Sequence, residues 1–188
     1  MAVQKLEVLD FSFLDIQDVK ELTEKLDYAS PPLQDSAPAD GEGDPRQRHI
    51  KNAAALRICN NALKDIAGLF AASATIVANP VSLRWLDLSF NGISVVPDDF
   101  ANFKDVSVIY LHANSISSLK DLKPLSKFSA LRKLTLHGNP IEDEENYRVL
   151  INLLCPSLRM LDFSVITRQD QQDTKFYESA FKKKLRGR

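Results

Sequence analysis

Residues 86–93 read Leu-Asp-Leu-Ser-Phe-Asn-Gly-Ile, in which apolar and polar residues alternate until the chain reaches an asparagine. A period of two places Leu86 and Leu88 on one face of a short strand and Asp87 on the other. The same frame, leucine-x-leucine-x-x-Asn-x-apolar, recurs with two isoleucine substitutions at residues 56–63, 109–116 and 134–141. Four copies in one chain indicate a repeat architecture in which each copy is one structural unit.

The asparagines of the frame, Asn61, Asn91, Asn114 and Asn139, are 30, 23 and 25 residues apart. The last two steps fall within the roughly 20–29 residues of leucine-rich repeats, and the longer first step indicates an insertion at 71–80. An asparagine amide both donates and accepts hydrogen bonds, so it can satisfy the backbone where the chain leaves each strand. We therefore interpret the four asparagines as a structural ladder. The predicted fold is α/β: a right-handed leucine-rich-repeat solenoid, or horseshoe, with a parallel concave sheet, short convex helices, and flanking helices at both ends.

Composition divides the chain into four segments. Residues 1–28 combine an alternating stretch with an apolar stripe at helical spacing, which predicts a strand and helix that either cap the first repeat or dock onto a neighbouring protein. Residues 29–49 are rich in Pro, Asp, Gly and Ser and predict a flexible linker. The repeat domain with its C-terminal cap occupies 50–165, and a helical tail with a charge balance of +4 occupies 166–188.

Overall composition excludes several classes of protein. The 188 residues are 44% hydrophobic and 26% charged, which is ordinary for a chain with one buried core. A formal net charge of -1 gives no general reason to bind nucleic acid or an anionic membrane. Two cysteines do not make a disulfide framework, and no apolar run approaches the roughly 20 residues of a membrane span. With no secretory apolar stretch at its start, the chain is expected to be cytoplasmic.

The strand phase predicts which side chains face the concave surface. They are Ala55, Arg57, Cys59, Trp85, Asp87, Ser89, Val108, Tyr110, His112, Lys133, Thr135, His137, Met160, Asp162 and Ser164. Trp85 beside Val108, and Tyr110 between Asp87 and Thr135, would form an amphipathic surface of the kind that anchors protein interfaces. The alternative is that the N-terminal segment or the tail covers Trp85. The candidate partner-binding residues are Arg57, Trp85, Asp87, Tyr110, His112, Lys133 and His137.

Positions in the repeat frame also indicate whether side chains could meet to form a catalytic or metal site. His112 and His137 occupy equivalent positions on neighbouring strands, which predicts a separation of about 5 Å. Zinc requires three or four ligands, and this column adds only Ser89 and Ser164, so we interpret both histidines as surface residues.

The other residues that could take part in catalysis or ligand binding fit a structural role better. Cys59 has no neighbouring histidine, Asp87 and Asp162 are too many repeats apart for paired carboxylate chemistry, and no glycine-rich phosphate loop is present. The acidic run at 142–145 fits a solvated helix start, with cation binding as the alternative. We therefore expect no enzyme activity, no catalytic residue, no cofactor and no metal.

Three repeats and two flanking segments carry a closer resemblance. They are similar to the leucine-rich repeat-containing protein 51 family at residues 85–91, 108–114, 134–140, 9–13 and 162–167. The stretch from the acidic run to Asp162 resembles the C-terminal cap of short cytosolic leucine-rich-repeat proteins. The resemblance implies a non-catalytic scaffold in the axoneme of a cilium or flagellum, with other axonemal subunits bound on the concave face.

The C-terminal tail offers a second surface. Its basic side chains, Lys182, Lys183, Lys184 and Arg186, could contact an acidic surface such as that of tubulin, or nucleic acid. The alternative is a solvated helix end, where cations are favoured by the helix dipole. The alternative function is accordingly a ribonucleoprotein or nucleic-acid-associated adaptor with a leucine-rich-repeat fold.

Overall fold

The computed structural model of the protein describes residues 8–29 and 53–186, with side chains up to residue 178. Its strands are β1 (Val8–Asp10), β2 (Ala55–Arg57), β3 (Trp85–Asp87), β4 (Val108–Tyr110), β5 (Lys133–Thr135), β6 (Met160–Leu161) and β7 (Ser164–Val165). Its α-helices are α1 (Glu21–Glu24), α2 (Leu69–Ser73), α3 (Tyr147–Leu154) and α4 (Arg168–Arg186). Its 3-10 helices are η1 (Leu26–Tyr28), η3 (Pro80–Ser82), η4 (Asp98–Asn102), η5 (Leu119–Lys127) and η6 (Pro140–Asp143).

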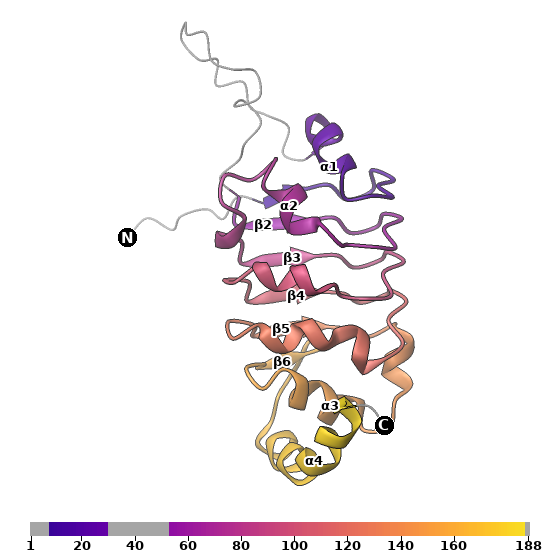
Figure 1. Ribbon diagram of the computed structural model, residues 1–188, viewed down its shortest axis with the longest axis vertical. Helices are drawn as coiled ribbons and strands as arrows, with labels where there is room; N and C mark the ends of the chain where they lie inside the picture. Colours follow the sequence, from indigo (N-terminus) through magenta and orange to yellow (C-terminus); the bar gives the residue numbers. More distant parts are fainter. Residues whose placement is uncertain (1–7, 30–52, 187–188) are drawn as a thin grey trace, which may run out of the picture.

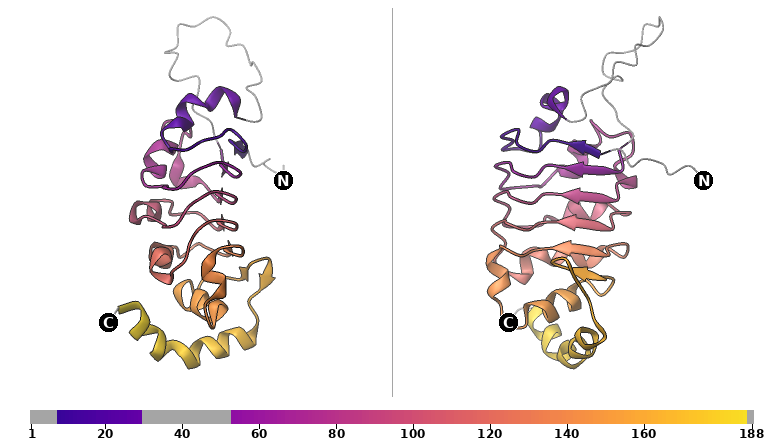
Figure 2. Two further views of the ribbon diagram at one scale, coloured as in Figure 1. Left: turned by 90° about the vertical axis from the view of Figure 1, so that its right-hand side faces the viewer. Right: turned by 180° about the vertical axis from the view of Figure 1, so that it is seen from behind.

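The strands form one sheet in chain order. Strands β1 to β6 are parallel, and β7 runs antiparallel to β6. The first leucine or isoleucine of each frame pairs with the corresponding residue of the next strand, as in Leu56 with Leu86 and Leu86 with Ile109. The strands are stacked one above another, and α4 crosses the C-terminal end of the stack (Figures 1 and 2). The predicted leucine-rich-repeat solenoid is confirmed.

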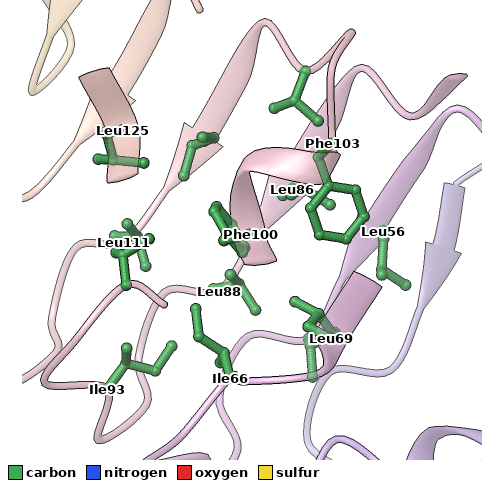
Figure 3. Packing of buried hydrophobic residues seen from close by; sticks show 14 of the residues in the cluster. Leu56, Ile66, Leu69, Leu86, Leu88, Ile93, Phe100, Phe103, Leu111 and Leu125 are labelled. Carbon is green, nitrogen blue, oxygen red and sulfur yellow. The ribbon is translucent and has the colours of Figure 1, made fainter. Parts of the chain in front are cut away.

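The core lies between the sheet and the convex segments. Between the strands, the spacing of the apolar residues in the convex segments predicts that they point inward, and these residues are all buried: Val96, Phe100, Phe103, Leu119, Leu122, Leu125 and Phe128. Phe100 packs against Phe103 and Phe128, with ring centroids 5.4 and 5.8 Å away, and it belongs to the buried cluster that includes Leu86 and Leu88 (Figure 3). The predicted insertion at 71–80 contains the end of α2 and buries Ile76 and Val77.

The frame asparagines link each repeat to the one before it. The Nδ2 group of Asn114 donates to the carbonyl oxygens of Leu88 and Leu111, both at 3.0 Å, while its Oδ1 accepts from the Ile93 amide at 3.0 Å. The same exchange between neighbouring repeats is made by Asn61, Asn91 and Asn139. The four side-chain amides therefore bridge neighbouring repeats through hydrogen bonds to the backbone.

The residue before each ladder asparagine turns the chain out of the strand in the left-handed conformation. These residues are Asn60, Phe90, Ala113 and Gly138, with φ of 55°, 53°, 54° and 70°. Phe13, at the corresponding place after β1, has φ of 63°. A left-handed conformation costs roughly 1–2 kcal/mol for a residue with a Cβ atom, so phenylalanine is unfavourable there.

The N-terminal segment packs on the first repeat. Strand β1 pairs with β2, and Leu9 lies opposite Leu56. The Nδ2 group of Asn61 donates to the Phe11 carbonyl at 2.9 Å, and its Oδ1 accepts from the Ile16 amide at 3.0 Å. Of the two alternatives for this segment, the described part takes the position of a cap. The predicted linker lies outside the described residues except for Ala29, and the division into four segments stays a prediction.

Helices α3 and α4 close the other end. Ile151 and Leu154 of α3 are buried, and Arg148 Nε lies 2.8 Å from Asp170 Oδ1 at the start of α4. The hydrogen bond from Arg148 holds the pKa of Asp170 at about 2. Thr167 and Asp170 form the capping box that begins α4, with Asp170 Oδ2 accepting from the Thr167 amide at 2.6 Å and the Asp170 amide donating to Thr167 Oγ1 at 3.1 Å.

Replacing Asn114 by Ala is expected to lower the free energy of unfolding by roughly 1–3 kcal/mol, because buried backbone groups of two repeats lose their partners. Urea denaturation monitored by circular dichroism measures the change. The matched control is Ser115→Ala, an exposed residue whose amide keeps its 2.8 Å bond to the Ile93 carbonyl. Equal stability of the two variants would contradict the role of the ladder.

Phe11 and Phe13 offer a test of the N-terminal cap. Phe11 has 0% of its surface exposed and Phe13 has 74%. We expect Phe11→Ala to cost roughly 3–5 kcal/mol as a core cavity, and Phe13→Ala to change stability by less than about 0.5 kcal/mol. Thermal unfolding of both variants measures this difference, and similar melting temperatures would show that the segment does not stabilise the repeats.

Candidate functional site

The predicted pairs of the concave face are present. Trp85 lies opposite Val108, while Tyr110 lies between Asp87 and Thr135. The rings of Trp85 and Tyr110 meet edge to face, with centroids 5.7 Å apart and planes at 71°. Trp85 is half-buried, and its indole Nε1 is inaccessible to solvent without a hydrogen-bond partner. These two rings therefore form a pre-assembled pair on a rigid sheet.

The two histidines stack on each other. The ring centroids of His112 and His137 are 4.7 Å apart with planes at 7°, which confirms the predicted proximity. Nδ1 of His112 lies 2.8 Å from Thr135 Oγ1, and Nδ1 of His137 lies 3.2 Å from Asp162 Oδ1. Within 8–29 and 53–186, no group of three His, Cys, Asp or Glu side chains is placed to hold a metal ion.

Two phenylalanines that the sequence did not single out join this face. The Phe90 centroid lies 5.2 Å from that of His112, and the Phe163 centroid lies 5.7 Å from Tyr110 and 5.8 Å from His137. Phe90 and Phe163 are exposed to 52% and 58%. We call Phe90, Tyr110, His112, His137 and Phe163 the aromatic patch.

Phe163 reaches the concave face through a reversal of the chain. Asp162 and Phe163 both have positive φ, 49° and 60°, in the two-residue turn that joins β6 to β7. Such turns favour Asn-Gly or Asp-Gly, so Asp162 suits the first position, whereas Phe163 stands where glycine is favoured. Simple alternation after Leu161 would have placed Phe163 inward. The sequence feature that could have indicated the chain reversal is that the regular repeat spacing ends before Phe163.

Asp162 ties the aromatic patch to the C-terminal cap. Its Oδ1 accepts from the amides of Leu136 and His137 at 2.6 and 2.9 Å, and its Oδ2 accepts from the Tyr147 hydroxyl at 2.7 Å. Burial, followed by the negative charge of Asp162, raises the pKa of Tyr147, so this hydroxyl stays a donor. The carboxylate therefore fixes the backbone beneath His137 and the start of α3 together.

The charged candidate residues of the concave face differ in their partners and in their exposure to solvent. Arg57 is bound to Asp10 at 2.7 Å and lies 3.4 Å from Asp87. Asp87 faces the concave side but is only 5% exposed, and its Oδ1 accepts from Ser89 Oγ at 2.6 Å. Asp87 thus positions Arg57 rather than presenting its own carboxylate. Lys133 is exposed at the opposite end of β5 from His137.

The basic candidates of the tail fall within α4, which runs to Arg186. The side chains of Lys182, Lys183, Lys184 and Arg186 lie outside the described part of the structure, so a contact with an acidic surface stays a prediction. None of the helices in the described residues is both long and apolar enough to cross a membrane.

Acidification is expected to lower the stability of the fold through the histidine pair. Burial, and then the nearby His137, lowers the pKa of His112, and Asp87 and Asp162 only partly oppose this. The unfolded chain therefore binds a proton more readily than the fold does, so stability present at higher pH is lost as pH falls below about 6.5. Nuclear magnetic resonance titration of the His112 ring and melting against pH measure the effect, with His112→Gln as the control. A pKa for His112 at or above its ordinary value would contradict it.

Comparison with known proteins adds the following similarities. A family model described as a leucine-rich repeat matches residues 78–186. The leucine-rich repeat-containing protein 51 of Mus musculus is 33% identical over 175 residues, which cover 90% of this chain and 84% of that relative. U2 small nuclear ribonucleoprotein A′ of Neurospora crassa is 35% identical over 97 residues, or 50% of this chain and 37% of that protein.

The fold is also similar to that of solved structures. A chain of the crystal structure of the Drosophila melanogaster SNF/U2A′ complex matches with a TM-score of 0.54 and 27% identity, covering 65% of this chain and 66% of that one.

Proposed function

The chain belongs to the leucine-rich repeat-containing protein 51 family, and on that premise we propose that it is a non-catalytic scaffold that holds a partner protein on its concave face. The observation that carries this proposal is the aromatic patch. Its exposed phenylalanines lie beside half-buried Tyr110, and Tyr110 in turn contacts Trp85 on the neighbouring strand. Aromatic side chains of this kind lose little entropy on binding and dominate the energy of many interfaces.

The scaffold would work by pre-organisation. The ladder asparagines hold adjacent repeats together, and the stacked histidines and the Trp85–Tyr110 pair are in contact before any partner arrives. A rigid surface avoids much of the ordering cost that binding otherwise carries. Arg57, held by Asp10 and Asp87, and the exposed Lys133 would form the polar edges of the same face.

We place this scaffold in the axoneme of a cilium or flagellum, as a cytoskeletal component whose partners are other axonemal subunits. The resemblance of the flanking segments to the family supports this setting. The basic end of α4 would contact an acidic surface such as that of tubulin. Localisation of the tagged protein, with crosslinking mass spectrometry of the compartment it occupies, tests both statements, and absence from cilia would contradict them.

Trp85→Ala and Tyr110→Ala are each expected to weaken partner capture by roughly 2 kcal/mol or more while keeping the fold. Capture is measured by quantitative co-purification from cells that express the tagged variants. Lys120→Ala, an exposed change on the convex η5, is the control and should capture partners normally. Unchanged co-purification by the double variant would contradict binding through this face, provided that circular dichroism shows an intact fold.

The alternative is an adaptor within a ribonucleoprotein. It is favoured by similarity to a protein named as a small nuclear ribonucleoprotein component and to a chain of the SNF/U2A′ complex. If the tail contacts phosphate, RNA affinity should fall steeply as salt concentration rises, because each neutralised phosphate releases counterions. Filter binding across a salt series measures this slope. A flat response, or no RNA binding, would remove the nucleic-acid contact.

A further inference from the structure

The hydrogen bonds around His137 fix which of its ring nitrogens can receive a partner. The Asp162 carboxylate, which accepts from two backbone amides and the Tyr147 hydroxyl, has no proton of its own to donate when ionised. The contact of 3.2 Å between its Oδ1 and His137 Nδ1 therefore requires the proton to lie on Nδ1. In the neutral ring, Nε2 is then an acceptor, and His137 is only partly buried, with 39% of its side chain exposed.

The surrounding rings favour a positive charge. Phe90 and Phe163 both contact His112, at centroid distances of 5.2 and 6.2 Å, and Tyr110 contacts Phe163. Aromatic faces carry negative electrostatic potential and attract ammonium and guanidinium groups. Over half of the surface of each phenylalanine remains exposed, so such a group could reach these rings.

Nearby charges have the complementary sign. On the concave strands, Arg57 is already neutralised between Asp10 and Asp87, which leaves one excess negative charge in that group. Asp162 adds a second negative charge directly behind His137. Lys133, the exposed cation of β5, lies at the other end of the strand. The side chains of Asp10, Asp87, Arg57 and Asp162 therefore sum to two negative charges near the aromatic patch.

The fold itself does not require these phenylalanines. The backbone of Phe90 is in the left-handed conformation, and in the fourth repeat the same frame position is filled by Gly138, with φ of 70°. Phe163 is also left-handed, at a turn position where glycine or asparagine is favoured. Residues in strained backbone conformations cluster at functional sites. Phe13 has the same conformation and is also exposed, but of the three only Phe90 and Phe163 contact the histidine pair, and this convergence of rings points to a ligand.

We propose that the aromatic patch binds an arginine side chain of the partner polypeptide, with the guanidinium over the rings of Phe90 and Phe163 and an N–H donated to Nε2 of His137. Arginine fits because its planar group stacks on aromatic rings and donates hydrogen bonds at the same time. This inference rests on the proposed function, since it gives the chemistry of the partner at the same face.

The test titrates the full chain with the peptide acetyl-Gly-Gly-Arg-Gly-Gly-amide, followed by nuclear magnetic resonance signals of the His137 and Phe163 side chains. The comparison peptide carries citrulline, which has nearly the same shape without the charge. We expect saturable shifts with arginine and affinity weaker by roughly tenfold or more with citrulline. Equal affinity for the citrulline peptide or for a leucine peptide, or no saturable shift with arginine, would overturn the proposal.

Matched variants separate the rings from the fold. Phe90→Gly and Phe163→Gly place glycine at left-handed positions that suit it, so both variants should stay folded. Phe13→Gly removes an exposed ring from the same frame position, with φ of 63°, beside β1 and remote from the histidine pair. We expect roughly tenfold weaker arginine-peptide binding for the first two variants and unchanged binding for Phe13→Gly. Unchanged binding by Phe163→Gly, or equal loss by Phe13→Gly, would overturn the proposal.

Together, the arginine-peptide titration and the partner-capture experiment distinguish arginine recognition from the proposed scaffold function. Loss of partner capture by Trp85→Ala and Tyr110→Ala without arginine-peptide binding would overturn the arginine proposal and leave the scaffold function standing. Saturable arginine binding with capture unaffected by those two substitutions would support arginine recognition and remove the scaffold function through this face.

Discussion

The hydrogen bonds of the ladder asparagines determine how one repeat is placed on the next. Each amide both donates to carbonyl groups and accepts from an amide of the preceding repeat, as Asn114 does with Leu88 and Ile93. Strands of three residues form too few sheet hydrogen bonds to define a register by themselves. The buried amides supply the missing links and make any slip costly, because a slip would leave buried backbone groups unpaired. The equal register from β1 to β5 follows from this constraint.

The candidate site is a consequence of that register. When every strand starts at the same level, residues at one frame position form a column, and this brings His112 onto His137. The same register brings Trp85 diagonally against Tyr110 on the next strand. The left-handed turn at the end of each strand then presents one more side chain beside the column, and in the third strand this residue is Phe90. The concave face is therefore a rigid array in which neighbouring side chains are already in contact.

The C-terminal cap has two roles in this arrangement. Asp162 accepts hydrogen bonds from the backbone of the last full repeat and from Tyr147 of α3, so the cap is joined to the sheet through one carboxylate. The same turn carries Phe163 back over Tyr110 and His137. A terminal repeat has a neighbour on one side only and must be atypical. In this protein, the atypical part completes the aromatic patch.

The sequence by itself determined the repeat frame, the ladder asparagines, the inward residues of the convex segments and the strand pairs of the concave face. These follow from short-range periodicity, which local alternation of side chains expresses directly. Only the tertiary structure decided that Asp87 is buried behind Arg57, that residues 8–10 pair with the first repeat, and that Phe163 belongs to the concave face. Each of these depends on contacts between residues far apart in the chain or on a reversal of direction. The alternation of apolar and polar residues within a segment does not predict such contacts. The same alternating pattern fits a chain that continues straight and a chain that reverses its direction.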